Sequence, residues 1–137
     1  MGNKNKHIVH KQTKFVNAQE LTLLVAEDSR AHADLIKYSL TQKGFKLTMV
    51  KDGFEAVEEI KRDSDYDAIL MDISMPRMDG YEATKRIRAL DFSKPIIGIS
   101  ALNFQENMDE GLAAGMNAYL AKPVDTEVLL VVLSDLL

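Results

Sequence analysis

The sequence of 137 residues contains no cysteine, and this absence removes several kinds of chemistry. There can be no disulfide framework, no thiolate metal site and no cysteine nucleophile. The chain also lacks an apolar stretch long enough to span a bilayer, and it does not open with a signal peptide. Its Met1-Gly2 start departs from the myristoylation pattern, because Lys6 stands where serine or threonine is required. These absences predict a cytoplasmic protein that makes no membrane contact.

The composition that remains is typical of one globular domain. Hydrophobic residues make up 46% of the sequence and charged residues 28%, and the length suits a single domain with a real core. Residues 1–20 differ, because they carry four lysines against one glutamate in a chain whose net charge is -4. We therefore predict a flexible basic tail over residues 1–20 and a folded domain over residues 21–137. Lysines without interleaved aromatic residues give no reason to expect nucleic-acid binding.

The predicted domain alternates strand-type and helix-type patterns five times. Continuously apolar strands separated by helices indicate a parallel sheet covered on both faces, an α/β fold whose ligands gather at the carboxyl ends of the strands. There is no internal repeat and no second domain, and we expect no attached output module. The predicted strands cover residues 21–26, 45–50, 68–71, 95–99 and 117–121, and the helices begin near residues 29, 53, 80, 102 and 125.

Acidic residues follow two of these strands. Glu27 and Asp28 come directly after the first strand, and Asp72 comes directly after the third. Carboxylates at the ends of adjacent parallel strands converge at one edge of the sheet, where their mutual repulsion requires compensation. A hard divalent cation such as Mg2+ prefers oxygen ligands of this kind. A carboxylate beside such a cation is also a possible nucleophile toward phosphorus, so the acids indicate phosphoryl chemistry on an aspartate.

Two further polar residues are predicted at the same edge. Ser100 ends the fourth strand and Lys122 ends the fifth. Three groups would then hold a transferring phosphoryl group: the lysine ammonium offsets the charge on one oxygen, the hydroxyl donates a hydrogen bond to another, and the metal holds a third. The loop after Asp72 contains Pro76, which favours a turn, and Asp79, which is placed to cap the next helix.

Over about residues 21–137 the sequence resembles the receiver domains of two-component response regulators. The resemblance implies a flavodoxin-like, doubly wound (βα)5 fold with a five-stranded parallel sheet in the order 2-1-3-4-5. The stretch from Met71 to Arg88 is especially similar to receivers of hybrid histidine kinases and phosphorelays. The motifs that carry the resemblance are Glu27-Asp28, Met71 to Pro76, Met78-Asp79-Gly80, Ser100-Ala101, Tyr119 and Lys122-Pro123.

The resemblance also implies how the acids act. Asp72 is the expected phosphoacceptor, and its donor is a phosphohistidine on a histidine kinase or a histidine phosphotransfer protein. Asp28 is expected to bind Mg2+ directly, together with Asp72 and the backbone carbonyl of Ser74. Glu27 is expected to hold the metal through water. It stands where aspartate is commoner in the family, and this difference bears on the water-mediated contact rather than on the existence of the site.

The remaining implied roles concern phosphoryl binding and a conformational switch. Lys122 and Ser100 are expected to bind the phosphoryl oxygens, and the Lys122-Pro123 peptide bond is expected to be cis. Ser100 is also expected to move toward the phosphate while Tyr119 turns inward. We expect a signalling module rather than a turnover enzyme, which promotes only its own phosphorylation and dephosphorylation. In the family, the residues at the positions of Ser74 and Leu102 influence attack of water on the acyl phosphate. Leu102 cannot orient a water molecule by hydrogen bonding, so we predict slower self-dephosphorylation than in a variant with a polar residue there.

Two other functions fit the predicted fold less well. A Mg2+-dependent phosphatase with an aspartate nucleophile needs a second aspartate two residues later, where this chain has Ser74. A flavin-binding electron carrier needs a phosphate loop after the first strand, where this chain has Glu27-Asp28-Ser29-Arg30. Three acids in the pocket would repel a flavin phosphate.

Helical periodicity predicts which side chains of the first and last helices are buried. Residues 102–137 are also predicted to offer a face for dimerisation or partner docking, to which Val128 and Val131 contribute. His7, His10 and His32 are predicted at the surface. The predicted buried face comprises Ala31, Leu35, Ile36, Ser39 and Leu40 in the first helix, and Leu129, Val132, Leu133 and Leu136 in the last.

Overall fold

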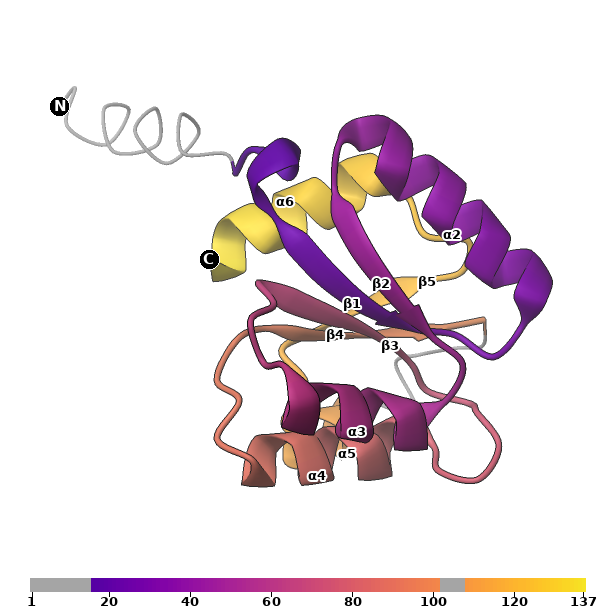
Figure 1. Cartoon of the computed structure of the whole chain (residues 1–137), viewed down its shortest axis with the longest axis vertical. Helices are drawn as coiled ribbons and strands as arrows, with labels where there is room; N and C mark the ends of the chain where they lie inside the picture. The colour runs from indigo at the N-terminus through magenta and orange to yellow at the C-terminus, as the bar shows by residue number, and fades with distance from the viewer. Residues whose placement is uncertain (1–15, 102–107) are drawn as a thin grey trace, which may run out of the picture.

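The computed structural model describes residues 16–101 and 108–137, which build a parallel sheet between two layers of helices (Figure 1). Each strand pairs in parallel with its neighbours, in the order β2-β1-β3-β4-β5. The predicted fold and strand order are therefore confirmed. The strands are β1 (Thr22–Ala26), β2 (Lys46–Val50), β3 (Ala68–Asp72), β4 (Ile96–Ser100) and β5 (Ala118–Ala121).

Helices α2 and α6 cover one face of the sheet, and α3, α4 and α5 cover the other (Figure 1). Aspartate or serine side chains cap four of these helices by accepting backbone N–H groups, which is why the helices begin where the sequence predicts. Within the described ranges, no helix combines the length and apolar character needed to cross a bilayer. The bounds are η1 (Ala18–Glu20), α2 (Arg30–Lys43), α3 (Gly53–Arg62), α4 (Gly80–Ala89), α5 (Met108–Ala114) and α6 (Thr126–Leu136).

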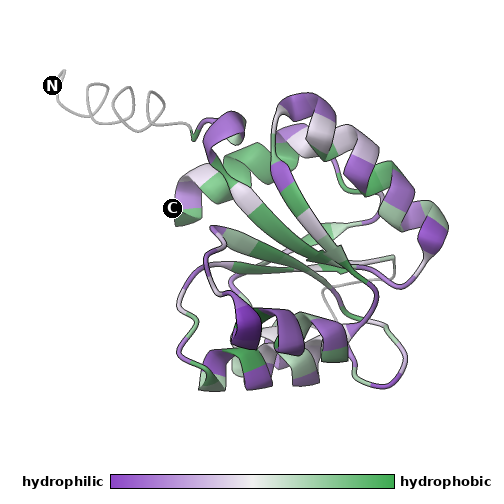
Figure 2. Ribbon diagram, viewed as in Figure 1, coloured by the Kyte–Doolittle hydropathy of each residue, from purple (hydrophilic) through white to green (hydrophobic). Residues whose placement is uncertain are grey.

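The sheet separates two hydrophobic clusters, one against each layer of helices. Successive strand residues alternate between them: Leu24 belongs to one cluster, whereas Leu23 and Val25 belong to the other. A strand covered on both faces is therefore apolar through most of its length, as β1, β3 and β4 largely are in Figure 2. The polar residues Asp72 and Ser100 stand at the ends of β3 and β4. Burying each leucine or isoleucine side chain stabilises the fold by roughly 1.5–3 kcal/mol.

The buried faces of helices α2 and α6 are narrower than predicted. In α2, Ile36 and Leu40 are buried, but Leu35 is 47% exposed. In α6, Leu129 and Leu133 are fully buried, but Leu136 is 36% exposed at the end of the helix. The predictions for Ala31, Leu35 and Leu136 are wrong, since all three side chains are exposed. In each helix, the buried hydrophobic residues are two side chains four positions apart.

The ordered structure begins before the predicted boundary of the tail. Ala18 is buried in the core cluster shared with α6, and Val16 packs against the same cluster. The backbone N–H of Val16 also donates a hydrogen bond to Ser134 Oγ at 3.2 Å. Residues 16–20 therefore belong to the packed structure. Residues 1–15 lie outside the described residues, and the predicted flexible tail there stays a prediction.

Arg88, near the end of α4, joins two connecting segments, the one that leads into β4 and the one that leads into β5. All five of its N–H groups donate hydrogen bonds: to the carbonyl oxygens of Phe92, Lys94 and Gly115, and to the Asn117 side chain, at 2.7–3.0 Å. The same oxygen of Asn117 accepts the backbone N–H at the start of β4. One guanidinium thus fixes the end of α4 to the turn that follows α5.

We predict that Arg88→Lys lowers the free energy of unfolding by about 1–3 kcal/mol, because lysine has three donors and cannot reach all of these acceptors. Urea denaturation would measure the change. The control is Arg86→Lys, since Arg86 lies on the same helix and pairs with exposed Glu82. That variant should change stability by less than about 0.5 kcal/mol. Equal effects of the two substitutions would contradict the role of Arg88.

Candidate functional site

The parallel sheet brings the three predicted acids to one point. Strands β1 and β3 are neighbours, with Ala26 opposite Met71, so the residues that follow meet at the same edge. One carboxylate oxygen from each of Glu27, Asp28 and Asp72 lies within 4.8 Å of the others. Glu27 and Asp72 are only 2% and 1% exposed, whereas Asp28 is exposed. Two buried carboxylates and one exposed carboxylate therefore form an acidic pocket.

Lys122 supplies positive charge to this acidic pocket. Its Nζ atom lies 3.0 Å from Asp72 Oδ2 and 3.1 Å from Glu27 Oε1. Burial alone would lower the pKa of Lys122, but hydrogen bonds to Asp72 and Glu27 outweigh it and raise the pKa. The lysine is therefore charged at neutral pH and bridges the two buried carboxylates.

One ammonium does not neutralise the pocket. Burial of Asp72 raises the pKa of its carboxyl group, and the neighbouring Glu27 raises it further, against the opposing effect of Lys122. Glu27 Oε1 is buried and has no hydrogen bond of good geometry, although Lys122 lies close by. An oxygen in that state is suited to a cation or to a water molecule held by one. The residues present thus fit a divalent cation with oxygen ligands.

A hollow of about 410 Å3 opens beside Asp72. Ser100, which is 7% exposed, ends β4 next to β3 and lines this hollow with Lys122. Exposed Ser74 lines it from the other side and donates its backbone N–H to Asp72 Oδ1 at 3.2 Å. The structure therefore brings Ser74, Ser100 and Lys122 together around Asp72, beside an opening through which a reactant can approach.

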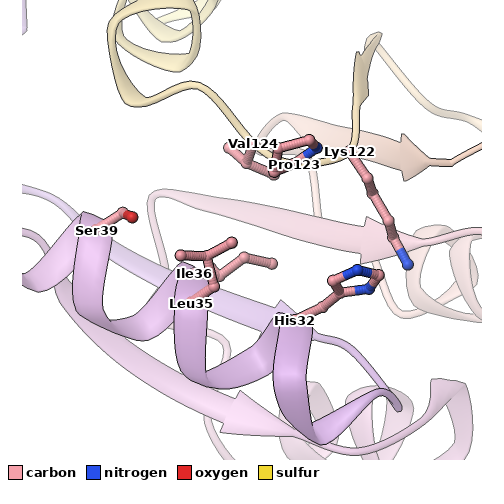
Figure 3. A pocket seen from close by; sticks show the side chains of 7 residues that line it. All are labelled: His32, Leu35, Ile36, Ser39, Lys122, Pro123 and Val124. Carbon is pink, nitrogen blue, oxygen red and sulfur yellow. The ribbon is translucent and has the colours of Figure 1, made fainter.

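A groove next to Lys122 was not expected from the sequence. It runs between α2 and the segment after β5, and Figure 3 shows the side chains that line it. His32 is half-buried there, and its Nδ1 atom is buried without a hydrogen-bond partner among the described residues, so the prediction of a surface histidine is wrong. The Lys122-Pro123 bond at the edge of the groove is cis, as expected. Exposed Leu35 lines the opposite side.

Tyr119 is directed under α5, into a space that two glycines leave open. A Cβ atom at Gly98 would lie 3.2 Å from the Tyr119 ring, and one at Gly111 would lie 1.5 Å from its hydroxyl oxygen. Burial raises the pKa of Tyr119, while hydrogen bonding to Tyr81 and to the Gly111 backbone opposes the shift. Tyr81 also lines the hollow beside Asp72. Sequence analysis missed Gly98, Gly111 and Tyr81, because nothing local marks glycines that accommodate a distant ring.

We predict that Asp72→Asn raises the free energy of unfolding at pH 7 in the absence of Mg2+. The folded-state pKa of Asp72 is raised, so the stability that this group contributes is fully present below its ordinary pKa of about 4 and is lost as the pH rises through the folded-state value. The advantage of the variant should therefore vanish below about pH 4. Urea denaturation across pH 3–8 would measure it.

The matched control for this prediction is Asp34→Asn, because Asp34 is an exposed aspartate on α2. Its effect should stay within about 0.5 kcal/mol at every pH. An Asp72→Asn protein no more stable than the original at pH 7 would contradict the electrostatic description of the pocket.

Comparison with known proteins places these features in a family. A family profile described as the response regulator receiver domain matches residues 23–134. The sequence is 34% identical over 118 residues to the sensor protein EvgS of Escherichia coli strain K12, covering 86% of this chain and 10% of that protein. It is 33% identical to the osmosensing histidine protein kinase SLN1 of Saccharomyces cerevisiae, with 87% and 10% covered. The chain thus spans about a tenth of the length of these relatives.

Solved structures agree with the sequence relatives. The receiver domain of sensor histidine kinase PA1611 from Pseudomonas aeruginosa PAO1, crystallised with a magnesium ion in its active site cleft, is 39% identical, with a TM-score of 0.77 and coverage of 85% of this chain and 96% of that one. The receiver domain of the histidine kinase CKI1 from Arabidopsis thaliana, complexed with Mg2+ and BeF3-, is 26% identical, with a TM-score of 0.78 and coverage of 86% and 91%.

Proposed function

The chain belongs to the response regulator receiver domain family, and we propose that its Asp72 accepts a phosphoryl group from a phosphohistidine on a partner protein. The observation that carries this proposal is the buried Asp72 carboxylate, held 3.0 Å from the Lys122 ammonium beside two further acids. The family is a signalling module rather than a classical enzyme. We propose that the histidine donor belongs to a histidine kinase or a histidine phosphotransfer protein in the cytoplasm.

The transfer is a displacement at phosphorus. An oxygen of Asp72 attacks the phosphoryl group of the phosphohistidine, the new P–O bond forms, and the P–N bond breaks as the imidazole takes up a proton and leaves. Lys122 then donates a hydrogen bond to one phosphoryl oxygen and Ser100 to another. The product is an acyl phosphate on Asp72.

The same arrangement explains why the pocket carries excess negative charge before transfer. Mg2+, when bound, would supply the charge that offsets both Asp72 and the incoming phosphoryl oxygens. We assign Asp28, Asp72 and the backbone carbonyl of Ser74 as its ligands, and Glu27 as a ligand through water. The buried Glu27 Oε1, which has no well-formed hydrogen bond, supports that last assignment.

Other parts of the sequence-based prediction stay predictions. Leu102, which we expect to slow dephosphorylation, lies outside the described residues. Docking or dimerisation through residues 102–137 is supported by exposed Leu112 and Val128, at 56% and 46%. Val131 is also exposed, and it lines a hollow together with Val16 and Leu130, beside the N-terminal segment.

We predict that Asp72→Asn abolishes phosphorylation and that Asp28→Ala abolishes both Mg2+ binding and phosphorylation. Transfer from a panel of phosphorylated histidine kinases and phosphotransfer proteins would be scored with radiolabelled phosphate, and Mg2+ binding by calorimetry. Asp34→Ala, which removes an exposed aspartate from α2, should leave both unchanged. Phosphorylation of Asp28→Ala at the original rate would exclude the metal assignment, and persistent labelling of Asp72→Asn would exclude the acceptor.

We predict that Gly111→Ala forces Tyr119 out of its position, because the added methyl group would overlap the hydroxyl. Overpacking costs about 1–3 kcal/mol, which exceeds the roughly 1 kcal/mol that alanine gains over glycine in a helix, so the variant should be less stable. Amide spectra of residues 108–121 should change before phosphorylation, and Mg2+ affinity should not.

Two companion variants test the cause of this change. Leu112→Ala alters the exposed neighbour of Gly111 and should leave the Tyr119 signals in place. In a protein that already carries Tyr119→Ala there is no hydroxyl to overlap. Adding Gly111→Ala to that protein should therefore cause no loss of stability. Additive losses in the double variant would show that Gly111 does not accommodate Tyr119.

A further inference from the structure

The loop of residues 73–79, between Asp72 and α4, is packed directly on the start of α3. A Cβ atom at Gly53 would lie 2.6 Å from the carbonyl oxygen of Met78 and 3.2 Å from that of Asp79. A Cβ atom at Gly80 would lie 2.3 Å from the carbonyl oxygen of Asp72. Two glycines therefore let three backbone segments touch: the end of β3, the loop, and the first turn of α3.

Arg77 closes this contact from the solvent side. Its Nε and Nη2 atoms donate hydrogen bonds to Asp52 Oδ2 at 2.9 and 2.5 Å, and its guanidinium carbon lies 5.0 Å from the centre of the Phe54 ring. Asp52 is only 5% exposed, and its other oxygen accepts the backbone N–H of Glu55 at 2.8 Å to cap α3. A single aspartate thus holds both the helix start and the loop.

The backbone of Arg77 has an uncommon conformation at this contact. Its φ angle is +65°, in the left-handed region that residues other than glycine seldom adopt. Burial would raise the pKa of Asp52, but hydrogen bonds from Glu55 and Arg77 lower it overall, so Asp52 is ionised when it pairs with Arg77. An unfavourable conformation persists where surrounding contacts determine it. Here the ion pair with Asp52 and the stacking on Phe54 supply those contacts.

We propose that Arg77, acting through Asp52 and Phe54, is a positioning residue that fixes the loop so that the backbone carbonyl of Ser74 faces the acidic pocket. Ser74 lies three residues before Arg77 in the same loop and lines the hollow beside Asp72. The inference rests on the proposed function, in which that carbonyl is a Mg2+ ligand. A loop already held in place binds the metal without first having to become ordered.

The test compares Mg2+ binding to the full chain and to Arg77→Asn. Asparagine tolerates a positive φ but cannot reach Asp52, so the substitution removes the contact and leaves the backbone conformation accessible. We expect the dissociation constant for Mg2+ to rise about tenfold, within the range seen when groups that orient metal ligands are lost. In the metal-free protein, amide hydrogen exchange should accelerate over residues 74–79, while the strands of the sheet keep their protection.

The matched control is Arg86→Asn. The side chains of Arg86 and Arg77 are similarly exposed, at 57% and 59%. They differ mainly in their partners, which are exposed Glu82 for Arg86 and buried Asp52 for Arg77. Arg86→Asn should bind Mg2+ like the original protein. An Arg77→Asn protein with unchanged Mg2+ affinity and unchanged loop exchange would overturn the proposal.

A double-mutant cycle with Asp52→Asn excludes a general loss of structure. Asparagine remains a good helix cap, so Asp52→Asn weakens the pair with Arg77 while retaining the start of α3. Its effect on Mg2+ affinity should overlap with that of Arg77→Asn, and additive effects in the double variant would count against a shared contact. Failure of the original protein itself to bind Mg2+ would instead refute the proposed function.

Discussion

The structure depends on one charge arrangement, in which the Lys122 ammonium lies between the buried carboxylates of Glu27 and Asp72 at 3.0–3.1 Å. Desolvated carboxylates repel each other, and the lysine removes only part of that repulsion. The pKa of Asp72 is raised, first by burial and then by Glu27, because part of the repulsion remains. The strand order explains why the charges must meet, since β1 and β5 flank the central pair β3 and β4 and all of these strands end at one edge.

The carboxylate repulsion that Lys122 leaves uncompensated and the proposed chemistry have the same origin. A pocket that were neutral at rest would have little affinity for a divalent cation, and a fully exposed pocket would leave Asp72 solvated and less sensitive to its neighbours. Burial of Asp72 and Glu27, with Asp28 at the surface, combines an attractive field with access for the metal. In the proposed function, such a site would trade stability of the metal-free fold for affinity toward the cation, as functional sites often do.

The fold and the acidic pocket could be predicted because their signals are local. Apolar runs, helix caps and strand-end acids each occupy a few consecutive residues, and parallel topology then fixes where they converge. Contacts between distant residues could not be predicted in this way. Gly111 accommodates the hydroxyl of Tyr119, and Arg77 reaches Asp52, without any pattern in the neighbouring sequence. His32 and Leu35 were misassigned for a related reason, since a groove beside α2 depends on the segment after β5.

Three arginines within twelve residues show how far environment decides the role of a side chain. Arg86 pairs with exposed Glu82 on the same helix, where an ion pair contributes at most about 0.5 kcal/mol. Arg88 donates all five of its N–H groups to oxygens of two connecting segments, so its removal leaves several acceptors unpaired. Arg77 contacts one buried aspartate and one ring, at the loop that carries Ser74. The residue type and charge are identical at the three positions. The different roles of the three side chains therefore follow from the partners that the fold places beside them.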